Sequence, residues 1–171
     1  IDLRSGSCNG TNISCKDATT GAGTELLNAT GLTIGNTYYV RVYDYYSSVP
    51  TTTTFTICVT TPVPTNDECS GATSLTVFGA TCGGATTGNV AGATLSITNA
   101  PCTGTSNDDV WYSFVATSAS HTITVAGSAN FDAVVNLRSG SCTGTSVTCA
   151  DNSSNGGTEV INATGLTLGS T

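Results

Sequence analysis

The stretch LRSGSCNGTNISCKD, residues 3–17, has a near-copy in LRSGSCTGTSVTCAD, residues 137–151. When the alignment is extended at the same offset of 134 residues, 21 of the 37 positions in residues 1–37 are identical to those in residues 135–171. A period of this length is too long for a solenoid unit and has the size of a domain. We therefore predict tandem repeat domains, with parts of two of them in this chain.

This period sets the expected domain boundaries. Residues 1–61 are predicted to be the C-terminal part of one repeat domain, and residues 67–171 the N-terminal part of the next. Residues 62–66, within the proline-containing stretch TPVPTND, are predicted to be a linker. Neither domain is whole within these limits, and a sheet that lacks strands has open edges. The chain is then a stretch of a longer tandem array, a subunit whose residues 38–60 complete a neighbour's sheet, or a truncated product.

Composition and alternation indicate the fold class. Charged residues make up only 9% of the chain, whereas Thr and Val, which favour strands, and Gly, Asn and Ser, which favour turns, are abundant. In residues 131–140 the apolar side chains of Phe131, Ala133, Val135 and Leu137 alternate, which places them on one face of a strand. We predict an all-β fold, a jelly-roll-like antiparallel β-sandwich stabilised by disulfides. Further strands are expected within residues 38–46, 55–60, 73–79, 109–116 and 121–127.

Eight cysteines in a chain of 171 residues indicate an oxidising compartment. Zinc binding is disfavoured because the chain has no C-x2-C pair and only one histidine, His121. Disulfides are therefore predicted, and with them a secreted protein, extracellular or at the cell surface.

The spacing of the cysteines suggests how they pair. Cys8 and Cys15 are seven residues apart, as are Cys142 and Cys149, so each pair is expected to close a local hairpin. Cys82 and Cys102 are expected to join each other. For Cys58 and Cys69 two alternatives stay open: they bond directly, or Cys69 bonds to the counterpart of Cys58 beyond Thr171, an in-domain pairing that we favour.

Charge and motifs exclude several functions. The net charge of −7 leaves no basic surface for phosphates, so nucleic-acid binding is not expected. No apolar run approaches the roughly 20 residues of a membrane helix. His121 has no partner motif, and the chain contains no G-x-S-x-G elbow, so no catalytic residue is predicted and the protein is not expected to be an enzyme.

Two sets of side chains are candidates for binding. Tyr39, Arg41, Tyr43 and Tyr45 lie on one face of the predicted strand and form a possible contact surface for a neighbouring domain or a sugar. Calcium is the only cofactor considered, and no metal site is favoured, because the D-x-D-x-D-G pattern is absent and turn hydrogen bonds explain the acidic residues. The weak calcium candidates are Asp108, Asp109, Asp132, Asp151 and Glu159.

Four blocks, NDECSGATSL, NDDVWYSFVA, FDAVVNLRSGSC and GNTYYVRVYDY, resemble a known family pattern. Together they are similar to the pre-peptidase C-terminal-like β-sandwich domains of secreted bacterial proteins, and above all to the tandem cysteine-containing repeats of Bacteroidetes-type surface and adhesin proteins. The resemblance spans essentially the whole repeat. It implies a jelly-roll-like fold and a non-catalytic accessory role.

Two hypotheses on function follow. The first is a structural repeat unit of an extracellular fibre or cell-surface adhesin, in which copies of the repeat associate through tandem domains or strand complementation between subunits. The alternative is a carbohydrate-binding accessory module of a secreted hydrolase, with surface glycans as its partners.

Overall fold

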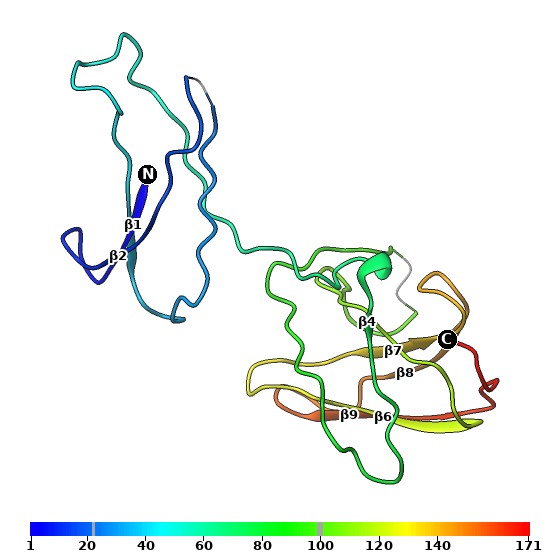
Figure 1. The fold of residues 1–171 in the computed structure, drawn as a ribbon. Coiled ribbons are helices and arrows are strands. Elements are labelled where there is room, and N and C mark those ends of the chain that lie inside the picture. Colours follow the sequence, from blue (N-terminus) through cyan, green and yellow to red (C-terminus); the bar gives the residue numbers. More distant parts are fainter. Residues whose placement is uncertain (22, 99–100) are drawn as a thin grey trace. The chain divides into compact units, whose positions relative to one another are not determined.

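The computed structural model describes residues 1–21, 23–98 and 101–171. It divides into two compact units, Ile1–Ile57 and Cys58–Thr171. Across the described residues the regular structure is β-strand, with one short 3-10 turn, η1 (Cys69–Gly71), and no α-helix (Figure 1). The predicted all-β fold class is confirmed. The boundaries of the repeat domains at residues 61 and 67 stay a prediction.

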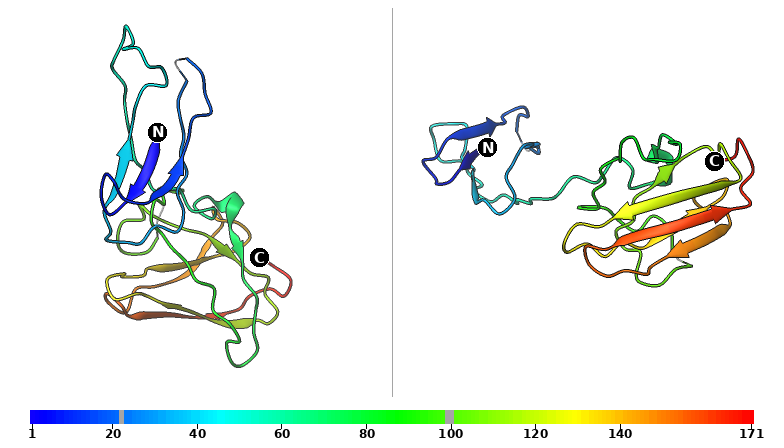
Figure 2. Two further views of the ribbon diagram at one scale, coloured as in Figure 1. Left: turned by 60° about the vertical axis from the view of Figure 1, so that its left-hand side comes forward. Right: turned by 90° about the horizontal axis from the view of Figure 1, so that it is seen from below.

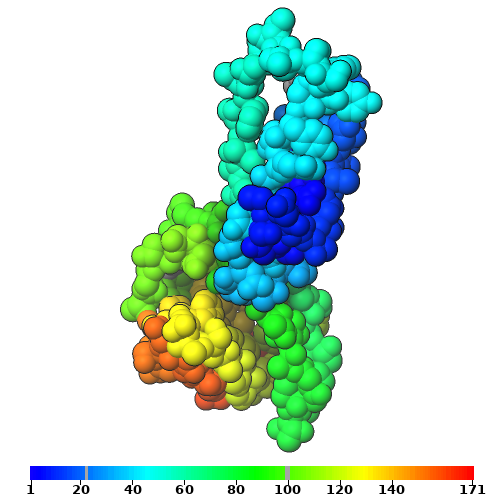
Figure 3. Space-filling view, turned by 90° about the vertical axis from the view of Figure 1, so that its left-hand side faces the viewer, coloured from blue at the N-terminus to red at the C-terminus, as the bar shows by residue number. Residues whose placement is uncertain are grey.

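The first unit is built around one antiparallel sheet. Its strands are β1 (Asp2–Ser5), β2 (Asn12–Cys15) and β3 (Tyr38–Arg41), in the order β2-β1-β3. The register of β1 and β2 shifts after Leu3, which marks a β-bulge. The segment that follows β3, coloured cyan, forms a thin loop in the space-filling view (Figure 3).

The second unit is a β-sandwich made of two antiparallel ribbons, which Figure 2 shows with their strands side by side. Its core consists of Ala150, Ile161 and Ala163, against which side chains of the facing strands pack. Ala133 is buried and Val135 and Leu137 pack on this core, as their alternation predicted. One ribbon pairs β6 (Ser120–Ala126) with β9 (Thr158–Thr164). The other ribbon pairs β7 (Val135–Arg138) with β8 (Ser146–Ala150). A short parallel pair is formed by β4 (Thr73–Ser74) and β5 (Tyr112–Ser113).

The disulfides overturn the predicted pairings. Cys69 bonds to Cys142, with 5.9 Å between their Cα atoms, and Cys102 bonds to Cys149, with 5.8 Å. The local pairs Cys8–Cys15 and Cys142–Cys149, the pair Cys82–Cys102 and both alternatives for Cys69 are therefore wrong. The physical reason is that Cys142 lies in the turn between β7 and β8, where Cys69 of η1 approaches it, whereas Cys149 lies within β8, beside Cys102. Cys8, Cys15, Cys58 and Cys82 are unbonded and exposed.

Two further predictions, about which segments form strands, are wrong. No strand forms in residues 55–60, where Phe55, Ile57 and Val59 are all exposed, because no other segment described by the structure pairs with them. In contrast, β9 forms outside the segments in which strands were predicted. Its signal is the alternation of Glu159, Ile161 and Ala163, all of which are buried.

The repeat is visible in the local geometry of both units. In β1 and β2, Asp2 lies opposite Cys15, Leu3 opposite Ser14 and Arg4 opposite Asn12. In β7 and β8 the equivalent residues pair in the same register, with the bulge at the same position. The corresponding pairs are Asn136 with Cys149, Leu137 with Thr148 and Arg138 with Ser146.

Candidate functional site

The repeated phrase folds into a hairpin that its arginine and glycines determine. Arg4 Nη1 donates to the carbonyl oxygen of Gly10 over 3.2 Å, and Arg138 Nη1 donates to that of Gly144 over 3.1 Å. A Cβ atom on Gly10 would lie 1.7 Å from the carbonyl oxygen of Ser5, so the turn accepts only glycine at this position. The spacing that both copies of the phrase share therefore serves the turn of the hairpin.

A glutamate organises the next turn in each unit. Glu159 accepts hydrogen bonds from the amides of Asn152, over 2.8 Å, and Ser153, over 2.7 Å. Glu25 accepts from the amides of Ala18 and Thr19 in the same way. Hydrogen bonds from the side chain of Thr19 and from these two amides lower the pKa of Glu25 to about 2. The hydroxyl of Ser153 and the amide of Asn152 likewise lower the pKa of Glu159.

A charged cluster joins β1 to β3 in the first unit. The buried carboxylate of Asp2 accepts from Arg4 Nε over 3.2 Å and from Arg41 Nε over 2.8 Å, and Arg41 Nη2 forms a further short contact. Burial raises the pKa of Asp2, but the bonds and charges of the two arginines outweigh burial and leave this pKa below its usual value. The second unit has Asn136 at the position of Asp2, so this ion-paired carboxylate belongs to the first unit alone.

The predicted contact surface is partly assembled. Arg41 lies over the ring of Tyr43 at 4.9 Å, while Tyr43 and Tyr45 are 63% and 76% exposed. Tyr45 packs edge-to-face on Tyr46, with 5.2 Å between the ring centres. The strand ends at Arg41, so the regular alternation that would align all four predicted residues is lost beyond this point. Tyr39 lies within the strand and is partly exposed.

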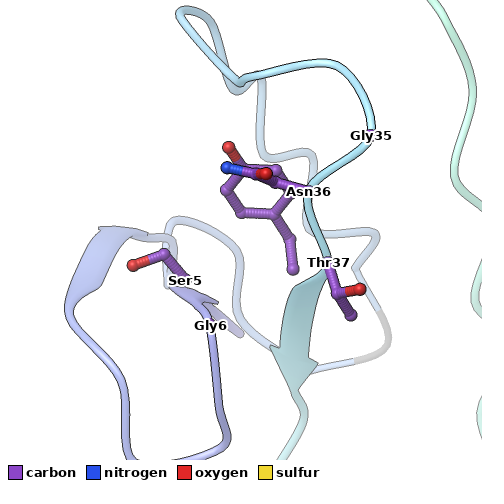
Figure 4. Close-up of a pocket in the computed structure, with 6 residues that line it drawn as sticks. Ser5, Gly6, Gly35, Asn36 and Thr37 are labelled. Atoms are coloured by element: carbon purple, nitrogen blue, oxygen red, sulfur yellow. The ribbon is translucent and has the colours of Figure 1, made fainter.

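The hollows of the first unit are shallow. One of about 300 Å³ is lined by Arg4, Cys8 and residues 39–42. Another of about 390 Å³ lies between the end of β1, at Ser5 and Gly6, and the loop of residues 35–38 (Figure 4). The lining of this second hollow contains hydroxyl, amide and backbone groups but no pair of acid and base, so it does not resemble a catalytic site.

Two aspartates of the second unit hold one loop. Asp67 accepts from the amide of Thr94, over 2.6 Å, and from its hydroxyl, over 2.8 Å. Asp109 accepts from the amide and hydroxyl of Ser96, over 2.9 and 2.5 Å. The indole of Trp111 donates to the same Ser96 hydroxyl over 2.6 Å. Sequence reasoning missed Asp67; its signal is the ND pair that recurs in NDEC and NDDV.

The calcium candidates do not come together at one site, and several of them accept hydrogen bonds from other groups of the protein. Asp109 and Glu159 accept from loop amides, and Asp151 accepts from the Thr103 hydroxyl. Asp108 and Asp132 are exposed. Within residues 1–21, 23–98 and 101–171, no three acidic, histidine or cysteine side chains gather as a metal site.

His121 supports a turn. Its Nε2 accepts from the amides of Thr117 and Ser118, each over 3.1 Å, and its ring packs edge-to-face on Phe114 with 5.5 Å between centres. An imidazole nitrogen that accepts two amide hydrogens is not positioned to serve as a general base, since its lone pair is already engaged. No helix in the described part of the chain is long and apolar enough to cross a membrane.

The comparisons with known proteins define the class. A family model described as galactose binding domain-like, and associated with the type IX secretion system (T9SS), matches residues 65–168. The match covers more than half of the chain, which therefore belongs to this T9SS-associated family. No curated protein and no solved structure matches the chain.

The family assignment has three consequences. Galactose-binding-like domains are β-sandwiches, in agreement with the two packed ribbons of the second unit. They are typically non-catalytic binding modules, and the T9SS association indicates a secreted or cell-surface protein of the Bacteroidetes. The β-sandwich fold and the secretion that the sequence motifs predicted agree with this family. The match is, however, not to the pre-peptidase C-terminal family itself.

Proposed function

We propose that the protein is a non-catalytic structural repeat of an extracellular fibre or cell-surface adhesin, in which neighbouring repeats complete each other. One observation carries this proposal: Leu27 and Ala29 of the first unit are only half-buried, whereas their counterparts in the second unit, Ile161 and Ala163, are buried. Leu27 lies at the position of Ile161, which is 3% exposed, yet residues 24–30 form no strand. A neighbouring repeat that covers this segment would remove apolar surface from water.

The chemistry of the surface supports such packing. Only 9% of the residues are charged, so few charged groups need to be desolvated when two repeats come together. The tandem arrangement with a period of 134 residues, the limits of the repeat domains at residues 61 and 67, and the kinship with pre-peptidase C-terminal-like adhesin repeats all belong to this proposal.

Electron microscopy and sedimentation velocity of the purified, oxidised chain test the proposal. Concentration-dependent oligomers or filaments are expected over a range of salt concentration and pH. Dispersed monomers under all of these conditions would contradict it.

A second candidate function is binding of surface glycans. The description of the matched family and the exposed rings of Tyr43, Tyr45 and Tyr46 favour it, since aromatic faces stack on sugars. Glycan-array binding that is lost in Tyr43→Ala and Tyr45→Ala, but kept in the exposed control Tyr112→Ala, would support this candidate. Equal binding by all three variants would contradict it.

A further inference from the structure

Two buried polar residues fix the chain of the second unit just before Cys69. Asn66 and Asp67 are 8% and 4% exposed. The Asn66 carbonyl oxygen accepts from the Trp111 amide over 2.8 Å, and the Asn66 side-chain amide donates to the Trp111 carbonyl oxygen over 3.0 Å. The Asp67 carboxylate accepts from the amide and the hydroxyl of Thr94. Tension that arrives along the preceding residues is therefore delivered to the domain at this point.

The segment of residues 61–64, which precedes this pair, also lies against the second unit. A Cβ atom on Gly92 would lie 2.8 Å from the carbonyl oxygen of Pro62, so the two backbones approach closely. The Asp67 amide donates to the Pro64 carbonyl oxygen over 3.1 Å. These contacts hold the segment to the domain up to the first disulfide-bonded cysteine.

The two disulfides cross each other along the chain. Cys69–Cys142 spans 73 residues and Cys102–Cys149 spans 47, and each loop contains one end of the other. Two covalent routes thus lead from Cys69 to Cys149. One passes through the Cys69–Cys142 bond and then along 7 residues, and the other runs along 33 residues to Cys102 and then through the Cys102–Cys149 bond. Under tension the shorter route becomes taut first, because the longer route is still slack at the same end-to-end distance.

We propose that the crossed disulfides form a two-stage, redox-sensitive stop that limits the extension of the second unit under load. Cys69–Cys142 carries the tension and holds residues 69–149 to a path of 7 residues. Cys102–Cys149 stays slack and bears load only after the first bond is cleaved. This inference rests on the proposed function, since a repeat of a fibre or a surface adhesin is pulled along its chain.

The bypassed loop contains most of the strands of the domain. β4, β5, β6 and β7 all lie between Cys69 and Cys142, whereas β8 and β9 lie beyond Cys142 on the loaded route. When load pulls β8 and β9 from the core, the other four strands lose partners but are not stretched. The ends of their loop stay joined, so refolding does not include the entropy cost of closing a loop of 73 residues.

Force-clamp spectroscopy with dithiothreitol as reductant tests the order in which the two bonds bear load. The sample is the full chain between marker domains that lack cysteine, with the four unbonded cysteines, Cys8, Cys15, Cys58 and Cys82, replaced by serine. A thiolate of the reagent attacks one sulfur of a disulfide, forms a mixed disulfide and releases the other cysteine as a thiolate. The second thiol of the reagent then displaces the first cysteine and closes a cyclic disulfide.

After the domain has extended, the reductant is expected to produce two further steps in a fixed order. Cleavage of Cys69–Cys142 lengthens the path from 7 to 33 residues, a step of about 90 Å. Cleavage of Cys102–Cys149 then lengthens it to 80 residues, a step of about 165 Å. The order is fixed because tension lowers the barrier only for the bond that carries it. A single step of about 250 Å in most molecules would mean that the other bond is cleaved first, and would overturn the proposal.

Two double variants give a matched comparison without reductant. Cys102→Ser/Cys149→Ser should extend as far as the parent, because its loaded path is the same. Cys69→Ser/Cys142→Ser should extend about 90 Å further, because its path runs through Cys102. Equal extension of the two variants would overturn the proposal. The expected lengths in a chain that stays monomeric in sedimentation would instead refute the assembly function and leave the extension stop standing.

Discussion

Residues 24–30, TELLNAT, and residues 158–164, TEVINAT, are nearly the same sequence in two different structures. In the second unit the segment is β9, seven residues that pair with β6 along their whole length. In the first unit the same segment has no strand structure, although its glutamate binds the preceding turn as Glu159 does. The difference shows that the turn bound by the glutamate forms from residues close in sequence, whereas the strand forms only where a partner strand is present.

The comparison extends to the core. Ile161 and Ala163 are buried between the two ribbons, while their counterparts Leu27 and Ala29 are partly exposed. A strand gains its stability from pairing and from burial of one face, and neither is provided for residues 24–30 by the part of the chain that the structure describes.

Loss of the Cys69–Cys142 disulfide should have the largest effect. The bond closes a loop of 73 residues, so the double variant Cys69→Ser/Cys142→Ser is expected to lose about 4 kcal/mol of stability. Amide hydrogen exchange should then show β9 with the weak protection that we expect for residues 24–30. Cys8→Ser is the matched control, because Cys8 is the unbonded counterpart of Cys142, and it should leave the denaturation midpoint unchanged.

Truncation of a core side chain should show the difference in burial directly. Ile161→Ala is expected to cost about 3 kcal/mol, since it leaves a cavity between the two ribbons. Leu27→Ala, the same position in the first unit, should cost about 1 kcal/mol or less, because its site is only half-buried. Urea denaturation of both variants measures the two values; similar losses would show that the first unit has a core of its own.

Substitution of the hairpin glycines should affect both units alike. A Cβ atom at Gly144 would lie 1.9 Å from the Ser139 carbonyl oxygen, and one at Gly10 would lie 1.7 Å from that of Ser5. Each alanine variant is expected to lose about 1–3 kcal/mol through overpacking. Loss of the amide cross-peaks of β1 and β2, or of β7 and β8, in NMR spectra provides the readout. A marked effect in only one unit would mean that the hairpin is not autonomous.

Acidification should produce the smallest effect. The pKa of Glu25 is about 2 in the folded chain, below its ordinary value of 4.5, so the carboxylate stabilises its turn above about pH 4.5. This contribution should be lost as the pH falls towards 2. NMR titration of the Ala18 and Thr19 amides should report it, and Glu25→Gln should abolish the transition. A transition near pH 4.5 in the parent chain would contradict the bond network.

The sequence by itself determined what is local. The doubled phrase, with its arginine and two closely spaced glycines, specifies the hairpin, and both units form it in the same register and with the same bulge. The alternation of Ala133, Val135 and Leu137 predicted the face on the core, and the composition predicted the all-β class. The hairpin depends on interactions between residues close together in the chain, so the repeated sequence produces the same structure in both units.

Only the tertiary structure decided the long-range partners. The cysteine spacing favoured local rings, but the bonds run over 73 and 47 residues, since the packing of separate strands and loops brings those sulfur atoms together. Likewise, residues 158–164 (TEVINAT) form a strand because β6 pairs with them. Residues 24–30 (TELLNAT), with a nearly identical sequence, form no strand. Which segments meet is set by the packing of the whole domain, and a short sequence pattern does not encode it.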